Sequence, residues 1–154
     1  MHIYQITKED AAEVAALVGE LLNEIMDKID VYAFDFDYEE TLQRLQEFIE
    51  KEKNYIFAAK EGEEIIGFIS LYESFTLYAN GAFGTIAELY VKPSYRSKGI
   101  GKELLESVRV FGEKRGWTRL EVTTPPLPQF DKTIEFYEKE GFEITGGRKL
   151  KTLI

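Results

Sequence analysis

Hydrophobic side chains recur every three or four residues in several long stretches of the chain, which is the spacing of an amphipathic helix. Thr7, with Asp10 three residues later, is typical of a helix N-cap, whereas Gly116 and Gly141 are typical of residues that follow a helix end. These patterns predict about four helices. They cover residues 8–27, 38–51, 100–115 and 131–140.

Shorter stretches are apolar or alternate between apolar and polar residues, which predicts strands. Tyr55–Lys60 and Glu64–Tyr72 flank Glu61-Gly62-Glu63, so they form a hairpin by length and turn chemistry. Glu73–Gly84 is polar and aromatic and contains the turn pair Asn80-Gly81, which predicts a surface loop or a hairpin tip. Further strands are expected at residues 3–6, 87–91 and 117–124, with a final pair at 142–144 and 148–153.

The order of these elements indicates how they connect. The strand at residues 117–124 follows a strand and a helix, so a right-handed crossover places it parallel to residues 87–91. Pro125, Pro126 and Pro128 exclude regular hydrogen bonding before the last helix. A chain of 154 residues with 44% hydrophobic side chains can fill one core, so we expect one domain over residues 1–154.

Composition restricts the possible chemistry. The chain has no cysteine, and its single histidine, His2, lies near the N-terminus. This excludes thiol nucleophiles, a Ser-His-Asp triad and metal sites built from cysteine or histidine, and we expect no metal. A general base must therefore be a carboxylate, tyrosine, lysine or water.

The formal net charge of −9 argues against a nucleic-acid surface, which needs clustered lysine and arginine. The charge suits a cationic amine substrate, although it can also serve solubility alone. No apolar run approaches the roughly 20 residues that span a bilayer, and the N-terminus lacks a charged region followed by an apolar one. We expect a cytoplasmic protein without a membrane partner.

The stretch Glu88–Lys102 combines a strand, a polar turn and a helix start. Gly99 and Gly101 allow close approach of a ligand or positive φ, and the first N–H groups of a helix can bind an oxyanion. Arg96, Lys98 and Lys102 add positive charge at the same end of the helix dipole. An ordinary strand-to-helix turn with a solvated basic rim is the alternative.

Two other phosphate motifs do not fit this turn. A Walker loop requires Ser or Thr after Gly-Lys, and here Glu103 follows Gly101-Lys102. A dinucleotide-binding G-x-G-x-x-G motif requires a third glycine, and Leu104 occupies that position.

The spacing Arg96-x-x-Gly99-x-Gly101 after a strand resembles the acyl-CoA signature of the GCN5-related N-acetyltransferases, the GNAT family. The segment Phe136-Tyr137 to Gly141-Phe142 is similar to a second signature of that family, F-Y-x-x-x-G-F. The resemblance implies an α/β fold with a mixed, mostly antiparallel, twisted sheet of six to seven strands. It also implies a central parallel pair that splays apart and about four flanking helices.

The same resemblance implies where acetyl-CoA, the acyl donor, would bind. The turn would hold its pyrophosphate through Arg96, Ser97, Lys98, Gly99, Ile100, Gly101 and Lys102. Its pantetheine arm would pair with the backbone of Leu89, Tyr90 and Val91 as an added strand, and the Val91 amide would polarise the thioester carbonyl. Many family members have an Asn after the neighbouring strand, whereas this chain has Thr123-Thr124, so side-chain help from that strand is in doubt.

Two residues match catalytic positions of the family. Tyr137 would be the general acid, because a phenol with a pKa of about 10 is protonated at neutral pH; the alternative is a core aromatic beside Phe136 and Phe142. Glu88 would be the base, often through water, because burial of a lone carboxylate raises its pKa. Alternation also allows Glu88 to face solvent as a structural residue.

Acceptor contacts are expected from two aromatic segments. Tyr32 and Phe34 lie in the aromatic and acidic stretch 30–37, which fits a wall for a positively charged amine. Core-facing aromatics with capping aspartates explain the same pattern. Phe75 and Tyr78 belong to a connection that can overhang the acceptor site in the resembled family.

The leading hypothesis is an N-acetyltransferase that moves an acetyl group from acetyl-CoA to a primary amine. The acceptor is a small molecule, a peptide or a protein, and a homodimer is possible by general symmetry preference. One alternative is a non-catalytic acyl-CoA-binding or regulatory module on the same fold. Another is an interaction protein whose basic turn binds a different anion, such as a phosphorylated partner.

Overall fold

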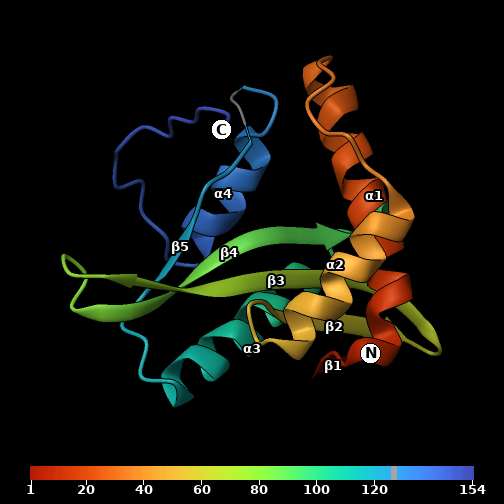
Figure 1. The fold of residues 1–154 in the computed structure, drawn as a ribbon, viewed down its shortest axis with the longest axis horizontal. Helices are drawn as coiled ribbons and strands as arrows, with labels where there is room; N and C mark the ends of the chain where they lie inside the picture. The colour runs from red at the N-terminus through yellow and green to blue at the C-terminus, as the bar shows by residue number, and fades with distance from the viewer. Residues whose placement is uncertain (126–127) are drawn as a thin grey trace. The chain divides into compact units, whose positions relative to one another are not determined.

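The computed structural model describes residues 1–125 and 128–154 (Figure 1). These residues form two compact units, Met1–Thr123 and Thr124–Ile154. Pro126 and Leu127, part of the predicted proline-rich break, lie outside the described residues. The first unit holds the sheet and three α-helices, and the second holds the fourth. One domain over residues 1–154 stays a prediction.

The sheet of the first unit has five strands in the order of the chain. Neighbouring strands are antiparallel, except that β4 and β5 are parallel, as the crossover argument predicted. The parallel pair lies at the edge of the sheet rather than at its centre. The strands are β1 (His2–Gln5), β2 (Tyr55–Glu61), β3 (Glu64–Thr76), β4 (Gly81–Val91) and β5 (Leu120–Val122).

The expectation of six to seven strands is not confirmed. Within the described residues, the two strands predicted at 142–144 and 148–153 are absent. Ile144, Leu150 and Leu153 are 76%, 89% and 91% exposed, so the apolar side chains that would hold such strands against a core are not packed. The predicted strand at 117–124 is also shorter, because β5 covers residues 120–122 alone.

Helices α1 (Ala11–Ile29) and α2 (Tyr38–Glu50) share one apolar core with the sheet (Figure 1). A short 3-10 turn, Lys8–Asp10, precedes α1. The Asp10 carboxylate accepts from the Thr7 N–H at 3.1 Å, so the predicted N-cap is present one turn before the α-helix begins. The core that these helices cover contains Val14, Leu17, Leu45, Ile56, Phe68 and Tyr90.

Helix α3 (Ile100–Lys114) packs on the sheet through an aromatic cluster. The Phe111 ring lies between Tyr55 and Trp117, with ring centroids 4.8 and 5.5 Å away. Trp117 also fills the space over Gly84 of β4, where an added Cβ would approach its ring to 2.5 Å. The Gly84 N–H donates to the Arg119 carbonyl at 3.2 Å, so Trp117 and this bond seat the start of β5 against β4.

The polar and aromatic stretch Glu73–Gly84 is the distal part of a long hairpin. β3 and β4 remain paired as far as Thr76 and Gly81, and the turn lies between these residues. The hairpin-tip interpretation is therefore correct, and the loop interpretation is wrong. Phe75, Leu77 and Tyr78 at this tip are 74%, 99% and 74% exposed.

The second unit contains α4 (Asp131–Lys139), on which Tyr137 is buried. The Tyr137 ring has Phe136 and Phe142 each with a centroid 5.1 Å away. The Phe142 N–H donates to the Tyr137 carbonyl at 3.0 Å, which closes the helix. Across residues 1–125 and 128–154, no helix is long and apolar enough to cross a membrane.

Candidate active site

The pairing of β4 with β5 ends next to a bulge in β4. Their ladder holds three residue pairs and ends at Ile86 with Val122. On the other edge of β4, Ser70 pairs with Glu88 and Leu71 with Ile86, so Ala87 is an extra residue. Beyond this bulge, β4 keeps β3 as its neighbour and has no strand beside its other edge in the described residues. Because β5 itself ends at Val122, the splaying of the pair stays a prediction.

The open edge of β4 carries main-chain groups of Leu89 and Val91. The Lys92 N–H donates to the Ile66 carbonyl at 2.9 Å and so points toward β3. Because main-chain direction alternates along a strand, the N–H groups of Val91 and Leu89 point to the opposite edge. The main chain of Tyr90 instead faces β3, and its side chain is buried in the core. Leu89 and Val91 are thus the residues that can pair with an extended ligand.

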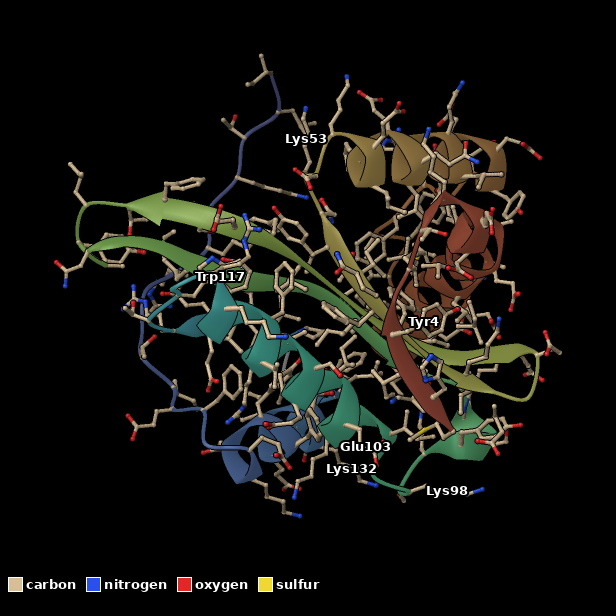
Figure 2. The ribbon with its side chains drawn as sticks, turned by 90° about the horizontal axis from the view of Figure 1, so that it is seen from below. Tyr4, Lys53, Lys98, Glu103, Trp117 and Lys132 are labelled. Carbon is tan, nitrogen blue, oxygen red and sulfur yellow. The ribbon has the colours of Figure 1, made fainter. Side chains whose placement is uncertain are left out.

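The turn after β4 leads into main-chain amides that donate no hydrogen bond within the described residues. Gly99 is the N-cap of α3 with φ of 81°, and Ser97 has φ of 63°. The first helical bond runs from the Glu103 N–H to the Gly99 carbonyl at 3.1 Å, so the amides of residues 100–102 precede it. Ser97, Lys98 and Gly99 are exposed, and Figure 2 shows Lys98 on this turn. The arrangement fits a phosphate group.

Arg96, which was expected to help hold the pyrophosphate, makes contacts within the protein, and its role in donor binding stays a prediction. Its guanidinium donates to both carboxylate oxygens of Glu24 on α1, at 2.7 and 2.9 Å. Its Nε donates to the Val91 carbonyl at 2.8 Å, and the group lies 5.4 Å from the Tyr90 ring centroid. The charge of Arg96 is therefore paired, and the residue ties the end of β4 to α1. Exposed Lys98 and Lys102 supply the positive charge near the turn.

Glu88 lies on the sheet face that α1 and α2 cover. Side chains two residues apart share a face, so Glu88 lies with Tyr90, and its partner Ser70 lies with Phe68. Ser70 Oγ donates to Glu88 Oε1 and accepts from the Glu88 N–H at 3.1 Å. Burial raises the pKa of Glu88 above the usual range of a carboxyl, and the Ser70 hydrogen bond partly opposes this shift. The fully solvated alternative for Glu88 is therefore wrong.

Tyr137, in the second unit, is 5% exposed. Burial raises the pKa of its phenol above the ordinary value, so the group is protonated at neutral pH. The ring contacts of Tyr137 agree with its interpretation as a core aromatic. Its protonated phenol agrees with the interpretation as a general acid.

The expected acceptor residues occupy two different places. Tyr32 and Phe34 lie between α1 and α2, and the Tyr32 hydroxyl donates to Asp35 at 2.9 Å. Phe36 of the same segment packs against Gly19 of α1, as the packing interpretation predicted for such aromatics. Phe75 and Tyr78 lie at the hairpin tip, where the Arg119 guanidinium is 5.3 Å from the Tyr78 ring centroid.

The structure also has an open groove of about 460 Å³ beside Tyr90 that the sequence patterns did not identify. Most of its lining comes from α1, where the carboxylates Glu20, Glu24 and Asp27 are spaced by four and three residues and so share one face. This spacing was a signal in the sequence that could have identified the acidic face. Lys28 also lines the groove, so carboxylates outnumber lysines three to one. Tyr90 connects the groove to the β4 face that carries Glu88. Within the described residues, no cluster of His, Cys, Asp and Glu could hold a metal ion.

Comparison with known proteins agrees with this architecture. A model of the acetyltransferase (GNAT) family matches residues 21–142. The uncharacterized N-acetyltransferase YhfO of Bacillus subtilis (strain 168) is 27% identical over 143 residues, covering 93% of this chain and 90% of the relative.

Two solved structures have the same fold. A predicted acetyltransferase from Clostridium acetobutylicum, solved with acetyl-CoA, aligns with a TM-score of 0.80 and 16% identity over 98% of this chain and 95% of its own. The aminoglycoside acetyltransferase meta-AAC0020 from an uncultured soil metagenomic sample, in complex with sisomicin, aligns with a TM-score of 0.76 and 21% identity. That alignment covers 99% of this chain and 96% of the neighbour.

Proposed function

Because the chain belongs to the acetyltransferase (GNAT) family and is an acetyltransferase of that type, we propose that it moves an acetyl group from acetyl-CoA to a primary amine. The observation that carries the proposal is the open edge of β4 at Leu89 and Val91, which continues into a turn with free amides at residues 100–102. An extended amide-containing arm and a diphosphate are the groups that such an edge and turn can bind in succession.

The residues present fit this donor. The amides of residues 100–102 would hold its phosphates, with Lys98 and Lys102 adding charge. Leu89 and Val91 would pair with its pantetheine arm, and the Val91 amide would donate to the carbonyl oxygen. The chemistry supplied by acetyl-CoA is a thioester whose acetyl carbon forms a bond to nitrogen while its bond to sulfur breaks. Fixing both reactants in one orientation provides much of the rate.

Two side chains would manage the protons. Glu88 accepts one proton from the ammonium form of the acceptor, directly or through water, and releases it to solvent. Tyr137 gives its phenolic proton to the departing sulfur and regains a proton from the newly acylated nitrogen. The sum converts an ammonium ion and a thioester into an amide, a thiol and one free proton. The raised pKa of each group supports its role, since Glu88 then binds a proton more readily than an ordinary carboxyl and Tyr137 keeps its proton at neutral pH.

We propose a cationic amine as the acceptor. The acidic groove beside Tyr90 and the formal net charge of −9 favour a positively charged substrate. A structural neighbour is an aminoglycoside acetyltransferase in complex with sisomicin, which is consistent with a polyamine or aminosugar class. Tyr32, Phe34, Phe75 and Tyr78 are candidates for acceptor contacts.

A thiol-release assay tests the proposal. Purified protein is mixed with acetyl-CoA and a panel of diamines, polyamines, aminoglycosides and a lysine peptide, and free CoA is measured. We expect turnover with at least one polycationic amine. CoA binding by calorimetry without turnover on any amine would instead indicate a non-catalytic acyl-CoA-binding module. Absence of both binding and turnover would exclude the acetyl-CoA assignment.

A further inference from the structure

Ser70 is a buried polar residue in the core of the sheet, with 2% of its surface exposed. Its hydroxyl contacts one residue twice, because it donates to the Glu88 carboxylate and accepts from the Glu88 N–H at 3.1 Å. A single hydroxyl therefore fixes both the main chain and the side chain of Glu88.

The place of this contact is set by the bulge in β4. Ala87 is the extra residue, so Glu88 rather than Ala87 lies opposite Ser70. Ala87 is exposed, whereas the Glu88 side chain turns toward the face that carries Tyr90. The bulge occurs directly after the last β4–β5 pair at Ile86, where the open edge begins. Ser70 thus holds Glu88 beside the bulge, one residue before Leu89 of the open edge.

The electrostatic surroundings of Glu88 determine what this contact does. Burial disfavours the charged form of Glu88, and the Ser70 hydrogen bond is the influence that opposes it. The titratable neighbours on the same face of the sheet are Tyr72 on β3 and Tyr90 on β4. From α1, the charged residues that line the groove with Tyr90 are Glu20, Glu24, Asp27 and Lys28. No arginine or lysine contributes to the pKa shift of Glu88 among the described residues.

Building on the proposed function, we propose that Ser70 is the positioning residue of the transfer reaction. Its hydroxyl holds the Glu88 carboxylate in one orientation and stabilises the charged form that accepts a proton from the acceptor. Ser70 touches no reacting atom and acts through Glu88.

The test compares pH profiles of kcat in four variants. In Ser70→Ala, the acid limb moves to higher pH, and kcat on that limb falls roughly tenfold, because a hydrogen bond to a charged group is lost. Ser70→Cys behaves similarly because a thiol is a weak donor, and it serves if Ser70→Ala does not fold. Ser70→Thr keeps a hydroxyl and restores the profile. Ser74→Ala is the matched control, since Ser74 shares strand and face with Ser70 but contacts the Thr85 hydroxyl at 2.7 Å.

A carbon-13 NMR titration of glutamate carboxyls, with the Glu88 signal assigned from its loss in Glu88→Gln, provides a readout that does not depend on activity. The proposal requires the Glu88 pKa to rise in Ser70→Ala and to be unchanged in Ser74→Ala. An unchanged Glu88 pKa in Ser70→Ala would overturn it, as would a raised pKa with an unmoved kcat limb. If the wild type acetylates no amine, the proposed function fails, and the titration still decides whether Ser70 stabilises the carboxylate.

Discussion

Arg96 and Glu24 form a two-pronged ion pair that joins the turn after β4 to helix α1, with nitrogen–oxygen distances of 2.7 and 2.9 Å. The pair is significant because the turn presents free amides on one side, while Glu24 lines the acidic groove on the other. The contact therefore connects the proposed donor and acceptor sites within the first unit.

The pair is expected to stabilise the fold modestly. Both side chains are partly exposed, at 37% and 25%, so solvent screening limits their interaction. In a double-mutant cycle of Arg96→Ala and Glu24→Ala, we expect a coupling free energy of about 1 kcal/mol in urea unfolding. The Lys92–Glu64 pair, at 2.8 Å but lacking the two-pronged geometry, is the control and should give about half as much or less. Equal coupling in the two cycles would contradict the proposed role of Arg96.

A substitution at Gly99 tests whether the turn at the start of α3 binds the phosphates of CoA. Its φ of 81° strains any side chain, although an added Cβ would meet nothing within 4 Å. Gly99→Ala should lower the free energy of unfolding by about 1 kcal/mol and weaken CoA binding severalfold, as measured by calorimetry. Gly62→Ala provides the control, because Gly62 has φ of 59° and open space in the β2–β3 turn. Gly62→Ala should lower the free energy of unfolding by a similar amount and leave CoA affinity unchanged. If Gly62→Ala also weakened CoA binding, the loss in Gly99→Ala would reflect general destabilisation rather than the turn.

The burial of Glu88 predicts the direction in which the free energy of unfolding changes with pH. Burial raises the pKa of Glu88 above its ordinary value of 4.5, so the native state binds the proton more tightly than the unfolded state. The contribution of this proton to the free energy of unfolding is fully present when the pH is below the ordinary pKa of a glutamate. It is lost as the pH rises through the pKa of Glu88 in the native state. Glu88→Gln removes the charge, so its melting temperature should exceed that of the wild type at about pH 8, with a smaller difference at about pH 4. The opposite trend would show that Glu88 is stabilised as an anion.

The substitution Tyr137→Phe distinguishes a role of Tyr137 as general acid from a role as a core aromatic. The ring contacts with Phe136 and Phe142 persist, so melting temperature should change little. Loss of the proton donor should lower kcat roughly a hundredfold, with little change in the KM for acetyl-CoA. Tyr32→Phe, which removes the hydroxyl of an exposed tyrosine, is the comparison and should keep kcat within a fewfold. An unchanged kcat in Tyr137→Phe would show that the phenol has only a structural role.

The acidic groove predicts selectivity for multiply charged acceptors. Asp27→Asn removes a carboxylate from the groove lining without changing its size. The KM for a triamine should rise several times more than the KM for a monoamine, and the difference should shrink at high salt. Glu47→Gln on α2, which removes the charge of an exposed ion pair, should affect neither. Equal KM changes for both amines in Asp27→Asn would argue against this groove as the acceptor site.

Local sequence patterns predicted the parts of the fold that depend on local interactions. The helical stripes, the β2–β3 hairpin and the parallel crossover follow from side-chain periodicity and chain connectivity. The extent of β3 and β4 was not evident, because Glu73–Gly84 mixes polar residues with exposed aromatic ones and is held largely by cross-strand pairing. The last two expected strands have apolar residues but no packed face, and the structure does not form them.

The sequence proposes the residues of the candidate site but does not show the contacts between them. The turn at residues 96–102 and Glu88 were identified from spacing and from a lone carboxylate in an apolar strand. Arg96 pairs with a residue 72 positions away, and no local pattern encodes that choice. Ser70 meets Glu88 through a one-residue register shift at Ala87, and a bulge of this kind cannot be located from alternation alone.

The most direct test of the central claim is a nitrogen-15 NMR titration of the backbone amides with CoA. We expect the largest shifts at Leu89 and Val91 on the open edge of β4 and at Gly101 and Lys102 at the start of α3. Control amides on the opposite edge of the sheet, such as Ile3 and Tyr4 of β1, should not move. Saturable CoA binding that shifts other amides and leaves these four unmoved would contradict this claim.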